Sequence, residues 1–222
     1  MSSHQEIQVC ADGNAIAARS KIYQTLSAIF MYPDTDEIAE FVLNGAQNAL
    51  KEAAAFLPFK VPAIDTIQPC SVSGKTELGA IYTRLFDNCG GSAMLSLHEK
   101  DYGSGDPKTL WEDLIRFYEY FGISYQLGIN KEWPDWIGIE FEFAHFLSYL
   151  EAGSDEDQSS SYLSAQSDFL ERHLGRWIPK FSVRLAKKAP DTPYALYADA
   201  MAEFVSADLQ YNLARRPRLQ AA

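Results

Sequence analysis

The segment from Tyr118 to Glu151 constrains the fold of this chain more than any other part of the sequence. It joins an amphipathic stretch, a glycine-containing loop and a stretch that is apolar on nearly every side. Pro134 suits the first position of a helix, because the backbone N–H that proline lacks would be unpaired there in any case. A helix with so little polar surface is stable only when other elements surround it. The sequence therefore predicts a central, mostly buried helix that begins at Pro134.

Apolar residues recur at helical spacing through most of the remaining chain. No segment keeps the alternation of polar and apolar residues that is typical of a half-buried strand. We therefore expect an all-α fold, a single-domain multi-helix bundle that spans residues 1–222. Further helices are expected near residues 12–32, 35–57, 78–87, 106–122, 163–175, 177–188 and 192–209, with loops at 59–73, 88–106 and 154–161 and flexible tails at 1–12 and 214–222.

The charge of the chain limits its partners. The formal net charge is −11, from 30 acidic and 19 basic residues, which disfavours nucleic acid and anionic membranes and favours a basic partner. The first residues do not form an export signal, and no window is long and apolar enough for a membrane span. The three cysteines are widely spaced, as expected for reduced thiols without a metal. These features predict a cytoplasmic protein with no stable membrane association.

One pair of residues could belong to a metal centre. Glu142 and His145 form Glu-x-x-His, half of the ligand set that helical bundles use for paired iron or manganese. None of His4, His98 and His173 has a glutamate three residues before it, so the second half of the set is missing. We therefore expect no metal and no other cofactor. A helical metal-binding enzyme that uses Glu142 and His145 is the alternative.

Other signatures of catalysis or nucleotide binding are weak. The string Ser73-Gly74-Lys75-Thr76 matches the end of a phosphate-binding loop, but Pro69 stands where that loop needs glycine. No nucleophile motif is present, and His98 and Glu99 in the glycine-containing loop are more readily explained by hydrogen bonds to backbone. The sequence favours a binding protein over an enzyme.

A helical wheel from Pro134 onward divides the central helix into two faces. Asp135, Glu142, His145 and Tyr149 lie on one polar strip, whereas Glu140 lies on the apolar side opposite. Glu151 shares that unusual position. A carboxylate there must reach solvent or meet a donor, because an unpaired buried charge is costly. For Glu140, a structural hydrogen bond and a role in ligand binding are both open.

The start of this helix has the chemistry of a peptide-binding surface. Gly138 lets another backbone approach, beside the acidic Asp135 and the aromatic Trp136. Carboxylates, aromatic faces and an apolar floor together suit a peptide that carries arginines next to an apolar run. A large aromatic core is the other explanation for this composition.

The same residues carry a family resemblance. Pro134-Asp135-Trp136 followed by Glu140-Phe141-Glu142-Phe143 resembles the signature of the TorD/DmsD/NarJ chaperones, in which Pro-Asp-His precedes Glu-Leu-Glu-Phe-Met. The run from His98 to Gly103 and the segment from Ala189 to Asp208 are also similar to that family. The chain resembles most closely the branch that serves type II DMSO reductase family enzymes, of the ethylbenzene dehydrogenase, dimethylsulfide dehydrogenase and selenate reductase type.

The resemblance implies a TorD-like, system-specific cytoplasmic chaperone. Such a protein binds the twin-arginine leader or N-terminus of the catalytic subunit of a molybdenum oxidoreductase and delays export until the cofactor is inserted. It is not an enzyme, and it is a monomer or a domain-swapped homodimer. A generic assembly adaptor without leader specificity is a further alternative.

By position, the resemblance also implies a peptide-binding site. Trp136 departs from the family pattern, which commonly has histidine at that place, so stacking or apolar contact replaces hydrogen bonding there. The residues expected at the site are Pro134, Asp135, Trp136 and Glu140, with His98, Glu99 and Tyr102 beside them.

Overall fold

The computed structural model describes residues 3–68, 71–87, 93–126, 129 and 131–216, with their side chains from Gly13 onward except those of Glu156 and Asp157. The regular elements among these residues are helices, with no strand, as the sequence predicts. No helix among them is both long and apolar enough to cross a membrane. The elements are α1 (Ser3–Ile29), α2 (Asp36–Glu40), the π-helical turn η1 (Phe41–Gly45), α3 (Ala46–Ala54), α4 (Pro62–Thr66), α5 (Gly74–Phe86), the 3-10 turn η2 (Glu99–Asp101), α6 (Pro107–Tyr120), α7 (Ile137–Ala152), α8 (Glu156–Arg172), α9 (Leu174–Lys188) and α10 (Pro193–Arg215).

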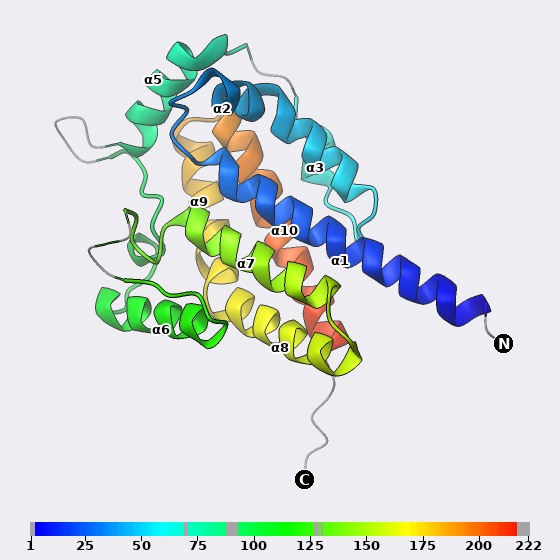
Figure 1. Cartoon of the computed structure of the whole chain (residues 1–222). Coiled ribbons are helices and arrows are strands. Elements are labelled where there is room, and N and C mark those ends of the chain that lie inside the picture. The colour runs from blue at the N-terminus through cyan, green and yellow to red at the C-terminus, as the bar shows by residue number, and fades with distance from the viewer. Residues whose placement is uncertain (1–2, 69–70, 88–92, 127–128, 130, 217–222) are drawn as a thin grey trace.

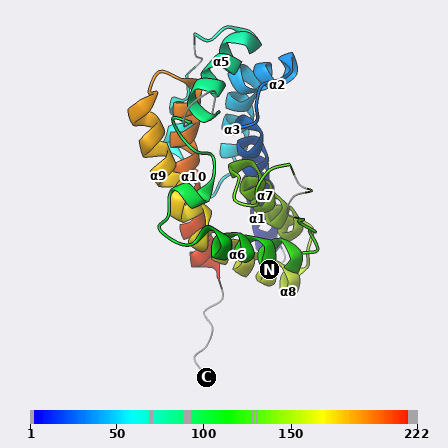
Figure 2. The same ribbon diagram turned by 90° about the vertical axis from the view of Figure 1, so that its left-hand side faces the viewer.

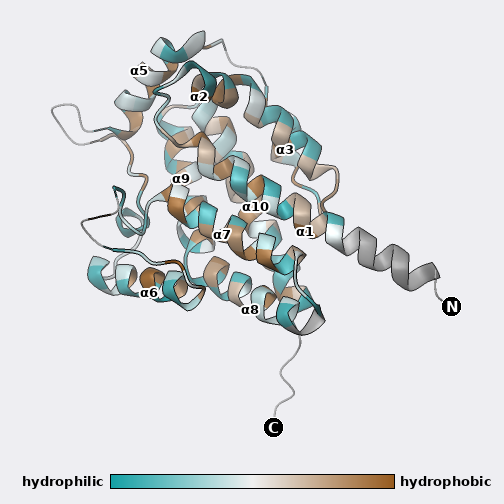
Figure 3. Cartoon of the chain, in the orientation of Figure 1, coloured by the Kyte–Doolittle hydropathy of each residue, from teal (hydrophilic) through white to brown (hydrophobic). Residues whose placement is uncertain are grey.

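Two helix pairs form the body of the molecule. α7 packs along α1, and α10 packs against α9, while α8 contacts both α7 and α10 (Figures 1 and 2). Most helices carry both brown and teal residues in Figure 3, as expected for helices with one buried and one exposed face. α7 is the most enclosed of the predicted helices, with Ile137, Phe141 and Leu147 fully buried. The prediction of a central buried helix is confirmed.

The start of that helix differs from the prediction. α7 begins at Ile137 rather than at Pro134, because Trp136 has an extended backbone with φ −75° and ψ 135°. The Ile137 N–H donates to Leu97 O at 2.9 Å, and the Glu99 N–H donates to Asp135 O at 3.0 Å. This short antiparallel pairing holds residues 135–137 against 97–99 and out of the helix. Asp135 is therefore not part of the polar strip on α7.

Three other boundaries also differ. α1 extends back to Ser3, so the residues after position 2 that were expected as an N-terminal tail lie in this helix. The stretch 154–161, expected as a loop, enters α8 at Glu156, because the Asp155 carboxylate accepts a hydrogen bond from the Gln158 N–H at 3.0 Å and caps the helix. α10 continues to Arg215, and positions 217–222 of the predicted C-terminal tail lie outside the described residues.

Gly175 does not end a helix as the sequence suggests. Helix α8 ends at Arg172, His173 lies between the two helices, and α9 starts at Leu174. A side chain at position 175 would lie 2.6 Å from the backbone oxygen of Leu170. Glycine is needed there for close approach of the two helices. This junction places His173 and α9 beside the 96–105 segment.

Candidate functional site

Residues 97–100 and 135–137 contact each other at the start of α7. The His98 Nδ1 atom lies 3.3 Å from Asp135 Oδ1, and the Lys100 N–H donates to Asp135 Oδ2 at 3.2 Å. Tyr118 of α6 donates its hydroxyl to Pro134 O at 2.8 Å. The structure thus brings together the residues that the sequence assigns to one site.

Burial separates these residues into two kinds. Asp135 and Glu140 are 0% exposed, and Glu99 and Tyr102 are 7% and 4% exposed. Pro134 is also buried, whereas His98 and Trp136 are half-buried. In this conformation only the last two offer an appreciable surface to a ligand, and the five buried residues shape the walls behind them.

Asp135 is held ionised by its neighbours. Burial alone would raise the pKa of its carboxyl, but the interaction with His98 and the backbone N–H of Lys100 lower that pKa below the ordinary 3.8. The carboxylate therefore joins the two segments through its side chain as well as through its backbone oxygen.

Glu140 has the opposite electrostatic environment. The Trp177 Nε1–H donates to Glu140 Oε2 at 3.0 Å, while Oε1 has no hydrogen-bond partner among the described residues. Burial, and next the charge of Glu99, raise the pKa of Glu140 well above the ordinary 4.5. The structural hydrogen bond considered from the sequence is present, and its donor is a tryptophan on α9.

Glu99 and Tyr102 contact α9 as well. Glu99 Oε2 lies 2.9 Å from His173 Nδ1, and His173 Nε2 lies 3.3 Å from Asp113 Oδ2. Burial would lower the pKa of His173, but its two carboxylate partners raise it above 6.5. The Tyr102 ring packs 5.3 Å from that of Trp177, centroid to centroid. Acidic and basic side chains thus alternate along this wall of the site, from Glu99 through His173 to Asp113.

The half-buried pair, His98 and Trp136, lines a cleft of about 830 Å³ that we call the acidic cleft. Four carboxylates lie along it, at Asp34, Asp87, Asp101 and Glu132, and Lys131 is the lysine among its described lining residues. Its apolar lining includes Met31, Tyr32, Ile38, Tyr82, Phe86 and Leu97.

Sequence reasoning missed most of this cleft. Met31 and Tyr32 are 44% and 48% exposed and come from the end of α1, far from the motif in the chain. Asp101 belongs to the run from His98 to Gly103 that carries the resemblance, so it could have been found. The other lining residues could not be identified from the sequence, because four separate parts of the chain meet there only in the folded structure.

The alternative metal site does not assemble from the described residues. Glu142 is exposed, whereas the Nδ1 atom of His145 lies 2.8 Å from Ser20 Oγ on α1. No group of three or more potential ligands occurs in the described part of the chain. His145 joins α7 to α1 in this structure.

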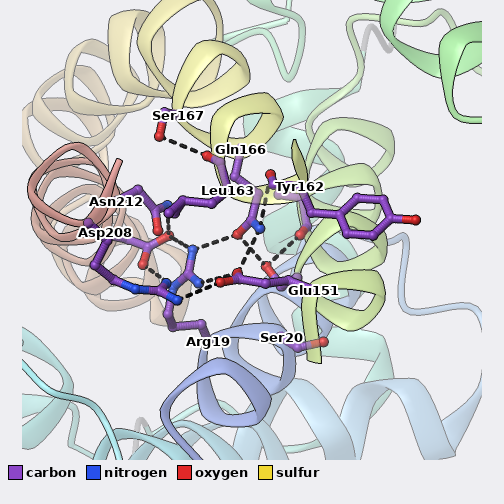
Figure 4. Close-up of polar contacts among 12 residues, drawn as sticks. Arg19, Ser20, Glu151, Tyr162, Leu163, Gln166, Ser167, Asp208 and Asn212 are labelled. Atoms are coloured by element: carbon purple, nitrogen blue, oxygen red, sulfur yellow. Dashed lines mark hydrogen bonds and ion pairs between the residues drawn. The ribbon is translucent and has the colours of Figure 1, made fainter. Parts of the chain in front are cut away.

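A second buried polar cluster, which we call the Arg19 cluster, lies at the other end of α7 (Figure 4). Arg19 contacts both oxygens of Asp208, and its Nη1 donates to Glu151 Oε2 at 3.0 Å. Its Nη2 donates to Gln166 at 2.6 Å, and Arg215 Nη2 donates to Glu151 Oε1 at 2.7 Å. Glu151 thus meets donors, as expected. No pattern in the sequence predicted that Arg19 would be buried.

Comparison with known proteins adds independent information. The family model described as nitrate reductase delta subunit matches residues 42–183. The chlorate reductase assembly chaperone protein of Ideonella dechloratans is 30% identical over 189 residues, which cover 82% of this chain and 83% of that protein. The selenate reductase assembly chaperone protein of Thauera selenatis is 31% identical over 191 residues, with 83% and 84% covered.

One further relative and one solved structure also match. The perchlorate reductase assembly chaperone protein of Dechloromonas aromatica is 28% identical over 210 residues, covering 88% of this chain and 90% of that protein. A solved structure of a candidate redox enzyme maturation protein from Archaeoglobus fulgidus superposes with a TM-score of 0.53 at 21% identity. It covers 84% of this chain and 93% of the other. The latter match supports the all-α fold alone.

Proposed function

The chain belongs to the nitrate reductase delta subunit family, and from this membership we propose that it is a cytoplasmic assembly chaperone for the catalytic subunit of a molybdenum oxidoreductase. Its relatives are named for the assembly of chlorate, selenate and perchlorate reductases. The TorD/DmsD/NarJ resemblance of the sequence leads to the same class of protein. Binding and release of a client subunit, rather than catalysis, is the proposed activity.

The proposed binding site for the client leader is the acidic cleft. The single observation that supports it is the combination of carboxylates and aromatic rings around one concavity. Two arginines can pair with Asp34 and Asp101, since guanidinium groups bond carboxylates through two parallel N–H donors. The ring of Trp136 can stack on a guanidinium. The apolar run of a leader then lies against Met31 and Ile38.

The buried residues of the predicted site take a supporting role in this proposal. Asp135 holds the 96–105 segment against the start of α7 and so fixes the position of His98. Glu140, through Trp177, ties α7 to α9 below that segment. Neither carboxylate has a surface for direct contact with a peptide in this conformation. Substitution of surface residues in the cleft is therefore the cleaner probe of binding.

Isothermal titration of the full chain with a synthetic client leader tests the proposal. We expect saturable binding that weakens about tenfold or more when both leader arginines are replaced by glutamine, because charge-assisted hydrogen bonds are lost. Trp136→Ala should weaken binding as well, whereas Trp133→Ala is the matched control, since Trp133 is 45% exposed but lies outside the cleft lining. Equal affinity for both peptides would favour the generic adaptor and overturn the leader-binding proposal.

A further inference from the structure

A second cleft lies on the opposite side of the 96–105 segment. It has a volume of about 660 Å³, between that segment, the start of α6 and the start of α9. Ser96, His98 and Asp101 of the segment face the acidic cleft, whereas Glu99, Lys100 and Tyr102 line this second one. We call it the basic cleft, because five lysines and arginines line it: Lys100, Arg116, Arg172, Arg176 and Lys180.

The carboxylates of the basic cleft already have partners. Glu99 contacts His173 at 2.9 Å, and both oxygens of Asp113 accept from Arg172. Glu112 lies 3.9 Å from Lys108, one turn before it on α6. Glu99 and Asp113 are therefore already paired, and the five cations of the cleft outnumber its three acids.

Most of the cations, in contrast, lack an acidic partner. Arg176 donates its Nε–H to the backbone oxygen of Glu171, and Lys180 donates to the backbone oxygen of Tyr102 at 3.0 Å. Lys100 stacks over the ring of Trp111 at 5.2 Å. For Arg116 no ion pair within 4 Å occurs in the described part of the chain. The cleft therefore carries a local positive charge on a protein whose net charge is −11.

The exposure of these cations fits a ligand-binding role. Arg116, Arg176 and Lys180 are exposed, so water can satisfy the donors that the backbone hydrogen bonds of Arg176 and Lys180 leave free. All three line the same cleft, together with the buried residues His173 and Trp177. A volume of this size suits a small molecule rather than a folded partner.

We propose that the basic cleft binds a small phosphate-bearing anion. Arginine forks match the geometry of phosphate oxygens, and two arginines with a lysine around one concavity supply the charge that a phosphate or pyrophosphate group needs. The site is distinct from the acidic cleft, whose proposed ligand is cationic and would be repelled here. This inference therefore does not depend on the leader-binding proposal.

Titration calorimetry of the full chain with inorganic pyrophosphate and, separately, with phenyl phosphate tests the proposal. We expect saturable binding of at least one probe, weaker at higher salt. The double variant Arg116→Gln and Arg176→Gln should lose about tenfold or more in affinity, because each substitution removes charge-assisted hydrogen bonds. Tighter binding of phenyl phosphate would identify an organic phosphate ester as the natural source, and tighter binding of pyrophosphate a free polyphosphate.

The control removes a positive charge from α9 at a position outside the basic cleft. Lys187→Gln replaces an exposed lysine of α9 that does not line the cleft, and it should leave the affinity unchanged. Circular dichroism establishes that all variants are folded, which is expected because the substituted side chains are exposed. Absence of saturable binding of both probes, or an equal loss in Lys187→Gln, would overturn the proposal.

Discussion

The two ends of α7 bury charge in contrasting ways. In the Arg19 cluster, two arginines meet two carboxylates, and Glu151 receives donors on both oxygens. Near the start of α7, an acid cluster comprises Glu99, Asp113, Asp135 and Glu140, with Arg172, His98 and His173 as its bases. One cluster is balanced at neutral pH, whereas the other has more acids than permanent cations.

The contrast separates stability from function. The Arg19 cluster joins α1, α7, α8 and α10 through the buried side chains of Arg19, Glu151, Gln166 and Asp208, in which Arg19 donates to each of the other three (Figure 4). The acid cluster lies beneath the segment that forms the wall of both clefts, and it leaves Glu140 with an unpaired oxygen and a raised pKa. Natural proteins concentrate such perturbed groups near functional sites. We therefore assign the first cluster to the scaffold and the second to the support of the binding surfaces.

Removal of the central cation gives the largest expected effect. Arg19→Ala leaves Asp208 and Glu151 buried without their main donor, and the free energy of unfolding should fall by about 3–5 kcal/mol. Urea denaturation followed by circular dichroism measures it. Arg84→Ala, which removes an exposed arginine of α5, is the control and should change stability by about 0.5 kcal/mol or less. A loss below about 1 kcal/mol in Arg19→Ala would show that the cluster does not support the scaffold.

The same glutamate-to-glutamine change in each cluster sharpens the comparison. Glu151→Gln removes a charge held by two arginines and should cost about 2–3 kcal/mol at neutral pH. Glu140→Gln should cost about 1 kcal/mol at most, because the folded protein already disfavours the charged carboxylate and the glutamine oxygen can still accept from Trp177. Urea denaturation of both variants provides the test.

The pH dependence of stability distinguishes these variants further. Because the folded pKa of Glu140 is raised, the folded state binds more protons than the unfolded state above the ordinary value of 4.5. This contribution to stability is complete below 4.5 and is lost as pH rises through the raised pKa. Glu140→Gln should gain stability relative to the wild type over that range. An equal pH profile for the two proteins would contradict a raised pKa.

The sequence was sufficient to predict an all-α fold and a buried α7, because both follow from the spacing of apolar residues along the chain. The starts of the helices expected near residues 106 and 192 were also correct, since the start of a helix is set by neighbouring residues: Asp106 caps α6, and Pro193 is the first residue of α10. The start of α7 was wrong because its backbone pairs with residues 97–99, and that contact is invisible to local reasoning.

The sequence predicted the motif residues of the candidate site, but not the other residues that line the two clefts. The motif around Asp135 and the run from His98 to Gly103 identified residues that do meet in space. The burial of Glu99 and Tyr102 was not foreseen, because it depends on tertiary contacts with His173 and Trp177. Both clefts combine side chains from distant helices, so their charges emerge only from the fold.

The most direct test of the proposed function measures the coupling between leader arginines and cleft carboxylates. The double variant Asp34→Asn and Asp101→Asn is titrated with the native leader and with a leader in which glutamine replaces both arginines. The double variant Asp65→Asn and Asp191→Asn, which removes the same charge outside the cleft, is the control. We predict that the cleft variant weakens binding of the native leader but not of the glutamine leader, a coupling free energy of about 1 kcal/mol or more. Equal losses with both leaders, or the same loss in the control, would contradict binding of the leader arginines in the acidic cleft.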